Sequence, residues 1–370
     1  MRHPRPRIAV SSCLLGEPVR YNGGHCRSRF LTERLAGHVD LVPVCPEMEI
    51  GLGAPRPSLR LVLDDGTVRL ATRDGSADHT GAMRELAARH ADGAAGLDGW
   101  VLRSRSPSCG VRGVSRYRRD MPADRRGRGV FAAGLIEARP DLPVEEDGRL
   151  NDPVLRAHFI ERIFAHARLR ALLDGPCRPR DLVAFHTVHK LQLLAHDPAR
   201  YRHLGKLVAS AGVAPPGSAP AGGAPAGSAS ARGASARGAS AGGASAGSAS
   251  ARGAPVGSAS GGSAAGGGAS DGSATRALVA GAYGSCFLEA FSVRPKRGRH
   301  VNALQHVFGP MSERLDDARR RDITGSIDAY GRGEVPLDIP MTLLRHHALG
   351  ENMEYLKQQT YFEPYPTDLR

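Results

Sequence analysis

One stretch of this chain cannot form a packed core, and it limits every fold that the rest can adopt. Residues 214–275 consist almost wholly of Ala, Gly, Ser, Pro and Arg in degenerate repeats, and Val256 is their only large apolar residue. Such a segment buries too little apolar surface to offset the entropy lost on ordering. We therefore expect a flexible, disordered coil here, with the folded parts of the chain on either side of it.

The first 150 residues alternate short β-prone runs with helical patterns. The expected strands span residues 7–13, 39–45 and 99–109, the expected helices span residues 28–38 and 80–95, and a helix–strand pair spans residues 130–144. Strands that alternate with helices are joined by right-handed crossovers into a mainly parallel sheet. The sequence therefore predicts an α/β N-terminal domain, residues 1–150, with helices on both faces of its sheet.

The rest of the chain shows helical periodicity. Phe159 and Ile163 recur at helical spacing after an Asn-Asp-Pro start signal, and Phe287 and Phe291 share one face beyond the low-complexity segment. We expect an all-α C-terminal domain made of residues 151–213 and 276–370, with residues 214–275 as a long disordered insertion.

Cysteine usage and the N-terminus indicate the compartment. The sequence shows no signal-peptide pattern at its start and no apolar segment of membrane length. Six cysteines are scattered through 370 residues, which is not the pattern of a secreted disulfide framework. We expect a cytoplasmic protein without a membrane segment, whose cysteines bind metal, catalyse a reaction or pack in the core.

The net charge of +13 would suit a nucleic-acid partner. However, nearly all the basic residues are arginines, and richness in Arg, Ala and Gly is what a GC-rich genome imposes on any protein. The sequence also contains no basic stripe with interleaved aromatic residues for base stacking. Nucleic acid therefore remains a weakly supported alternative partner.

Three cysteines recur at equivalent points of the predicted sheet. Cys13, Cys45 and Cys109 each follow a predicted strand, so the carboxyl edge of a parallel sheet would bring their thiols together. Three converging thiolates form a soft-metal site. They can hold zinc with water or His25 as the fourth ligand, or a [4Fe–4S] cluster with one iron that lacks a protein ligand. Spacing alone does not choose between the two.

Longer motifs around these cysteines carry a family resemblance. Residues 11–25, 42–62, 104–110 and 129–153 together resemble the thiouracil desulfidase (TudS) family, and the likeness extends over roughly residues 5–155. The helical segments 182–209, 300–315 and 335–347 resemble the YbgA domain, which is often fused behind the desulfidase domain.

The resemblance implies a cofactor and a reaction. Cys13, Cys45 and Cys109 match the three ligands of a [4Fe–4S] cluster, and the open iron would act as a Lewis acid on a thiocarbonyl sulfur. The expected enzyme is a hydrolase that removes sulfur without net redox chemistry. Its substrate would be a small thiolated base or nucleoside, thiouracil-like, or a related thioamide, and it would release sulfide.

The same resemblance implies two catalytic residues. Glu47 would manage the protons of water and of the ring nitrogen, and Ser106 would hold the ring or the attacking water, with Ser108 or Ser104 as substitutes. Cys26 is expected to be a bystander, because a fourth thiolate would block the open iron.

The alternative function is a non-catalytic zinc or Fe–S module that binds nucleic acid or a partner protein. Elsewhere we expect unremarkable roles: Glu49 as a solvated carboxylate and Arg56 as an exposed arginine. His186 and His189 are expected to be satisfied polar side chains of a helix rather than a second metal site.

Overall fold

The computed structural model of the 370-residue chain describes residues 3–118, 121–211 and 268–370. Of the expected coil at residues 214–275, the part up to residue 267 lies outside the described residues. Helix α8 (Gly268–Ser292) begins before the predicted boundary at residue 276.

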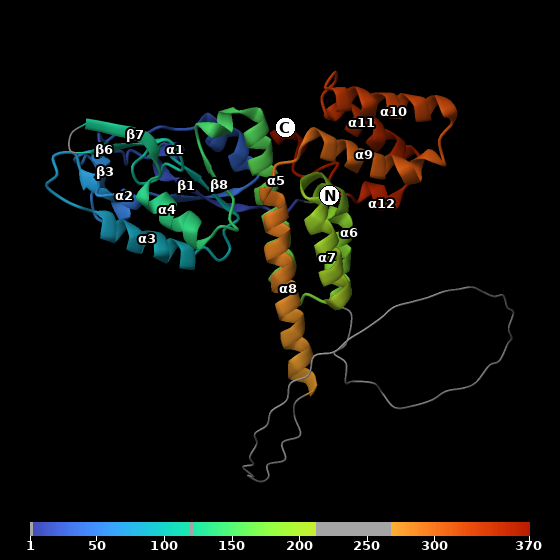
Figure 1. The fold of residues 1–370 in the computed structure, drawn as a ribbon, viewed down its shortest axis with the longest axis horizontal. Helices are drawn as coiled ribbons and strands as arrows, with labels where there is room; N and C mark the ends of the chain where they lie inside the picture. Colours follow the sequence, from blue (N-terminus) through green and yellow to red (C-terminus); the bar gives the residue numbers. More distant parts are fainter. Residues whose placement is uncertain (1–2, 119–120, 212–267) are drawn as a thin grey trace, which may run out of the picture. The chain divides into compact units, whose positions relative to one another are not determined.

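Four strands form an all-parallel sheet in the order β2-β1-β5-β8. Figure 1 labels two of them, β1 and β8. They are β1 (Arg7–Ser11), β2 (Asp40–Val44), β5 (Gly99–Leu102) and β8 (Val144–Glu146). The prediction of a parallel α/β sheet is thereby confirmed. β1 and β5 are the central strands and are almost wholly buried, as parallel strands covered on both faces must be.

Helices supply that cover through two apolar clusters. On one face, α3 (Thr80–Asp92) and α4 (Val130–Ala138) contribute to a cluster that includes Trp100 and Phe131. The other cluster joins Val10 and Leu31 to the long helix α5 (Pro153–Leu173). The predicted helix at residues 28–38 is a π-helical turn, η1 (Phe30–Arg34), followed by a 3-10 turn, η2 (Leu35–Gly37).

A second sheet of order β4-β3-β6-β7 was not predicted. It consists of two antiparallel hairpins joined by parallel pairing of β3 with β6. Its strands are β3 (Leu59–Asp64), β4 (Thr67–Thr72), β6 (Val114–Arg118) and β7 (Met121–Gly127). Asp65 and Gly66 form the first turn with φ of 43° and 84°, so the Asp-Gly pair was a hairpin signal that the sequence analysis did not use.

The C-terminal region is all-helical, as predicted. Its remaining elements are α6 (Pro179–His196), α7 (Pro198–Ala211), α9 (Arg297–Ser312), α10 (Asp317–Arg332), α11 (Asp338–Gly350), α12 (Glu354–Lys357) and η4 (Thr367–Leu369). Asp152 caps α5 by accepting hydrogen bonds from the amides of Val154 and Leu155, and Pro153 occupies the first turn. In the part of the chain that the structure describes, no helix is long and apolar enough to cross a membrane.

A buried carboxylate ties the parallel sheet to α5. Asp98, immediately before β5, is 0% exposed. It accepts hydrogen bonds from the Arg7 amide, from His166 Nδ1 at 2.9 Å and from both Nε and Nη2 of Arg170. Burial alone would raise the pKa of Asp98, but the hydrogen bonds from His166 and Arg170 outweigh it and lower the pKa below its ordinary value of 3.8.

We expect Asp98→Asn to lower the free energy of unfolding by about 3 kcal/mol at pH 7, because it leaves buried donors without their anion. A lowered folded-state pKa contributes stability above the ordinary Asp range and loses it as pH falls through the folded value. The difference in the free energy of unfolding between wild type and variant should therefore decrease as pH falls below about 4. Urea unfolding at a series of pH values measures this difference.

Asp174→Asn is the matched control, because Asp174 is 67% exposed and contacts the same Arg170 at 3.5 Å. It should change stability by less than about 1 kcal/mol. Equal losses in the two variants would contradict a special role for Asp98.

Candidate active site

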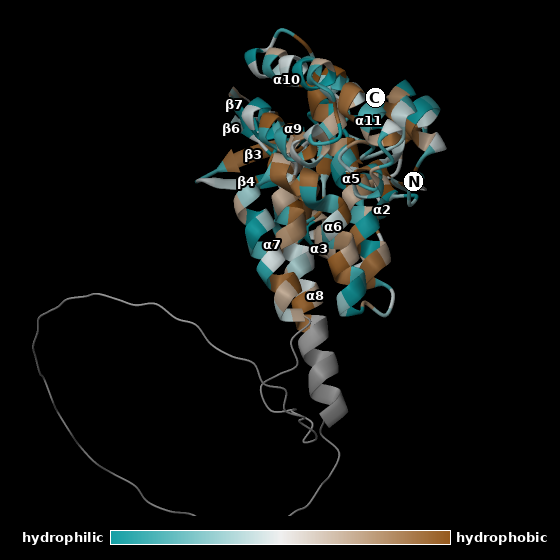
Figure 2. Cartoon of the chain, turned by 90° about the vertical axis from the view of Figure 1, so that its right-hand side faces the viewer, coloured by the Kyte–Doolittle hydropathy of each residue, from teal (hydrophilic) through white to brown (hydrophobic). Residues whose placement is uncertain are grey.

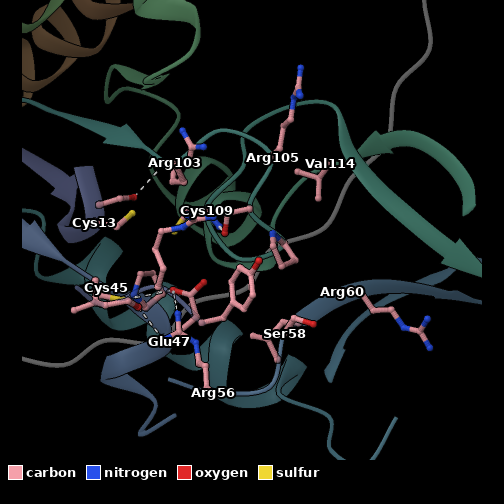
Figure 3. A pocket seen from close by; sticks show the side chains of 18 of the residues that line it. Cys13, Cys45, Glu47, Arg56, Ser58, Arg60, Arg103, Arg105, Cys109 and Val114 are labelled. Atoms are coloured by element: carbon pink, nitrogen blue, oxygen red, sulfur yellow. Dashed lines mark hydrogen bonds and ion pairs between the residues drawn. The ribbon is translucent and has the colours of Figure 1, made fainter. Parts of the chain in front are cut away.

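A cavity of about 570 Å³ lies at the carboxyl edge of the parallel sheet. One wall is formed by the residues that end β1, β2 and β5, and the other by β3 and β6 of the second sheet. Cys13, Cys45 and Cys109 all line it, and Figure 3 shows the three thiols toward the same side, with Glu47 below them. The predicted convergence of three distant thiols on one edge of the sheet is present.

Each cysteine is positioned by the segment that follows its strand. Cys13 lies in α1 (Ser12–Leu15), a single turn directly after β1. Cys45 is the N-cap residue of α2 (Pro46–Glu49), and its extended backbone, with φ of −129°, ends β2 before Pro46 starts the helix. Cys109 lies in the turn beyond β5. Since β2, β1 and β5 are neighbours, the three segments leave the sheet side by side.

The turn that holds Cys109 is built by Ser106. The Ser106 hydroxyl oxygen accepts hydrogen bonds from the amides of Ser108 and Cys109, at 3.2 and 3.1 Å. Its carbonyl oxygen accepts from the Gly110 amide, and a Cβ atom on Gly110 would lie only 2.7 Å from that oxygen. The turn therefore needs both the serine hydroxyl and the glycine.

The other two candidate serines are arranged differently. Ser104 lines the cavity, but its hydroxyl donates to Asp147 at 2.6 Å and accepts from the Gly148 amide. Ser108 is fully buried and is not among the cavity-lining residues. Ser106 lines the cavity and uses its hydroxyl only as an acceptor in the hydrogen bonds above.

Burial controls the protonation of the three thiols. It raises the pKa of Cys13 to about 12 and, together with the neighbouring carboxylate of Glu47, the pKa of Cys45 to about 11. It raises the pKa of the fully buried Cys109 thiol well above its ordinary value. The metal-free site is therefore protonated at neutral pH, and thiolates form there when a metal displaces the protons.

Glu47 faces the cavity in a well-packed setting. Its side chain is 12% exposed, with Oε2 at 3.6 Å from the Cys45 thiol and 3.8 Å from Arg56 Nη2. The expectation of an exposed Arg56 was wrong: its side chain is 7% exposed. Arg56 Nη1 donates to the carbonyls of Val19 and Gly53, at 2.9 and 2.7 Å. Arg56 thus holds the loops on both sides of Glu47.

Two further expectations concern neighbours of this site. Glu49, expected as a solvated carboxylate, binds His90 Nε2 at 2.6 Å and so ties α2 to α3. The Cys26 amide donates to the Cys13 carbonyl at 2.8 Å, so the two cysteines are adjacent, yet Cys26 does not line the cavity. Its expected role as a bystander stays a prediction.

Six arginines line the cavity, and no function was predicted for them from the sequence. They are Arg20, Arg56, Arg60, Arg73, Arg103 and Arg105. Arg103 is held by Asp147 at 2.5 Å, and Arg20 stacks over the ring of Tyr21 at 5.6 Å. These arginines lie in different loops and strands, so no local sequence pattern identifies them as a group. Because the whole chain is rich in arginine, their number gave no signal either.

Cysteine thiolates are ligands of both zinc and iron–sulfur clusters. Within residues 3–118, 121–211 and 268–370, no group of three or more His, Cys, Asp or Glu side chains is arranged to hold a single metal ion. The three thiols are not arranged around a single ion in this way, and neither are His186 and His189. The ring nitrogens of these two histidines form hydrogen bonds with Tyr283, Phe185 and Arg168 instead. Zinc needs its ligands within about 2.0–2.3 Å of one point. A [4Fe–4S] cluster binds its thiolates through separate iron atoms, and three cysteines that line one cavity could supply them.

Two family models match the chain. One, described as 2-thiouracil desulfurase, matches residues 8–147. The other, described as a protein of unknown function (DUF1722), matches residues 269–366. The predicted resemblance to a desulfidase-type domain followed by a YbgA-type region is confirmed.

Individual relatives agree with this division. The uncharacterized protein YbbK of Bacillus subtilis is 33% identical over 157 residues, which cover 39% of this chain and 98% of YbbK. The uncharacterized protein YbgA of Escherichia coli is 36% identical over 67 residues, which cover 18% of this chain and only 40% of YbgA.

A solved structure described as "[4Fe-4S]-dependent thiouracil desulfidase TudS" is 29% identical, with a TM-score of 0.34, and the match covers 41% of this chain and 98% of that one. The family model matches residues 8–147, and YbbK is matched over nearly its whole length at 33% identity. The chain therefore belongs to the 2-thiouracil desulfurase family, joined to a helical region that matches DUF1722.

Proposed function

We propose that the protein is an iron–sulfur-dependent desulfidase that hydrolyses the C=S bond of a thiolated pyrimidine. The observation that carries this proposal is the meeting of Cys13, Cys45, Cys109 and the Glu47 carboxylate on one cavity. In the reaction, the oxygen of water replaces sulfur on the ring carbon and the sulfur leaves as sulfide. No electrons are transferred to or from the substrate.

The three cysteines would hold a [4Fe–4S] cluster through their thiolates. When bound, the cluster would supply a thiophilic iron without a protein ligand, which polarises a C=S bond as a Lewis acid. Cys26 is not needed as a ligand in this arrangement, and its absence from the cavity lining supports that reading.

Glu47 is proposed as the general base and acid. Its carboxylate lies in the cavity within 3.6 Å of a ligand thiol, where an attacking water and a ring nitrogen would both be within reach. Arg56, which is itself held by two backbone carbonyls, keeps this carboxylate in place. Ser106 is proposed to orient the substrate ring or the water, because its hydroxyl hydrogen can donate into the cavity while its oxygen holds the Cys109 turn.

The volume of the cavity and the charges that line it are evidence about the size and charge of the substrate. About 570 Å³ is in the range that encloses a drug-sized ligand, and the bound cluster would share this space with the substrate. We propose a thiolated base that carries a further group, as in a nucleoside or nucleotide. The arginines around the cavity favour a negatively charged group over a neutral one.

Anaerobic reconstitution of the wild-type protein should give about four irons per chain, with thiouracil consumed and sulfide released. Cys109→Ser should lose both iron and activity, because one of three ligands is removed. Cys26→Ser is the matched control and should keep both. Loss of iron in Cys26→Ser would contradict the three-cysteine site, and bound zinc in place of iron would overturn the cluster.

Glu47→Gln should keep iron content and the visible spectrum but lower kcat by about 10²–10⁴-fold, the usual contribution of a general acid–base group. Glu49→Gln is its control on the same short helix, because Glu49 does not line the cavity. Ser106→Ala should lower activity and also loosen the Cys109 turn, which a lower yield of bound iron would report. Full activity in Glu47→Gln would reject the assigned role.

The raised thiol pKa values predict slow alkylation of the metal-free protein. With a pKa of about 11, only about one Cys45 thiol in a thousand is a thiolate at pH 8. Labelling by iodoacetamide should then rise about tenfold per pH unit from pH 8 to about pH 10, as followed by peptide mass spectrometry. The urea-unfolded protein is the control and should label rapidly near pH 8.5, the ordinary cysteine value. A plateau at that pH in the folded protein would contradict the prediction.

A further inference from the structure

Cys26 is the cysteine of the α/β domain that the proposed cluster leaves without a function. It lies in a segment that returns to α1 after the loop that follows this helix. The Cys26 amide donates to the Cys13 carbonyl, and the Ser28 amide donates to the Leu14 carbonyl, both at 2.8 Å. These two backbone hydrogen bonds hold the segment of Cys26 alongside the segment of Cys13.

The backbone spacing of the two cysteines suits a disulfide. A backbone N–H···O=C bond brings the Cα atoms of its two residues to roughly 5–6 Å, as it does between strands. Disulfides span Cα–Cα separations of about 4.4–6.8 Å. Both side chains also pack against the same apolar cluster, the one that includes Val10 and Leu31. A bond between the two sulfur atoms therefore needs no large movement of the backbone.

The electrostatic environment indicates which thiol is the closer neighbour of Cys13. Burial is the main cause that raises the pKa of Cys13 to about 12, and the Cys26 thiol is the second cause. It has a larger effect than either Glu47 or Cys45, although both of these line the cavity with Cys13. Because the interaction between charges weakens with distance, the Cys26 thiol lies nearer to Cys13 than the Cys45 thiol does.

The pair is also accessible and has a positive charge beside it. Both thiols are partly exposed, and Cys26 lies between two exposed residues. Arg103, which Asp147 holds at 2.5 Å, interacts electrostatically with both sulfur atoms. A nearby guanidinium stabilises the thiolate, which is the reactive form of cysteine.

We propose that Cys13 and Cys26 are a redox pair, which closes to a disulfide when an oxidant has removed the cluster and so keeps the ligand Cys13 recoverable. The pairing follows from the contacts above, and its regulatory role rests on the proposed function. While the cluster is bound, Cys13 holds iron and Cys26 stays free. Once the cluster is lost, the disulfide blocks the site until a thiol reductant opens it.

The oxidant belongs to the hydroperoxides, of which hydrogen peroxide is the simplest. One thiol sulfur attacks a peroxide oxygen and the O–O bond breaks, which gives a sulfenic acid and water. The second thiol displaces the sulfenic oxygen as another water, and the S–S bond forms. The two sulfurs lose two electrons to the peroxide, and the two thiol protons leave in the waters. Without a second thiol, more peroxide converts the sulfenic acid to a sulfinic acid, which thiol reductants do not reverse.

The cysteines of the helical region provide a matched control. Cys177 and Cys286 are also free and partly exposed. They pack against a different apolar cluster, which contains residues of α6 and α8. Figures 1 and 2 show these two helices side by side. The variant Cys177→Ser/Cys286→Ser therefore removes two thiols and leaves the Cys13–Cys26 pair intact.

The test treats the iron-loaded full chain with hydrogen peroxide until its visible absorption is lost, alkylates the remaining thiols and maps them by peptide mass spectrometry. The wild type should contain a Cys13–Cys26 disulfide within one chain. Dithiothreitol followed by anaerobic reconstitution should then restore most of its iron. Cys26→Ser and Cys26→Ala should carry sulfinic or sulfonic acid at Cys13 and recover less than about half of their iron. The control variant should behave like the wild type.

Several results would overturn the inference. They are the absence of a disulfide, a disulfide from Cys13 to Cys45 or Cys109, a bond between two chains, and equal recovery of iron by the wild type and the Cys26 variants. Peroxide treatment of the metal-free full chain tests the pairing apart from the cluster. A Cys13–Cys26 disulfide there, in a protein that binds no iron and does not desulfurise thiouracil, would reject the proposed function and leave the pair standing.

Discussion

The parallel pairing of β1 with β2 and with β5 is the constraint on which the site depends. Ser11 is paired with Val44, and Val10 with Val101, so the three strands end at the same edge of the sheet. Cysteines that are far apart in the sequence follow those ends directly. A shift of one residue in either register would turn the strand's side chains to the opposite face and separate the thiols.

Around this edge, the structure combines buried apolar strands with an unusually polar cavity. The thiols gain protection from solvent, which raises their pKa values and leaves them protonated until a metal binds. Glu47 and Arg56 are both largely buried, and each stabilises the charge of the other. Removing either partner would leave an uncompensated charge, so the pair couples the stability of the loops to the geometry of the site.

Much of the fold could be predicted because its signals are local. Alternating strand and helix patterns, the Asp152 cap and the apolar helix faces are all readable over a few residues. The two halves of the second sheet were missed for different reasons. The Asp65–Gly66 turn was an available signal, whereas β6 and β7 are rich in arginine and lack the apolar alternation of a half-buried strand.

The parallel sheet, the helical C-terminal region and the thiols that follow the strands could be predicted from the sequence, because backbone propensity and hydrophobic periodicity act between near neighbours. The folded chain was needed to show that Arg56 is buried, that Glu49 binds His90, and that Ser106 shapes the turn of Cys109. It also decided that arginines from several segments surround one cavity. Burial and electrostatic environment depend on segments that are distant in sequence and meet only when the chain folds.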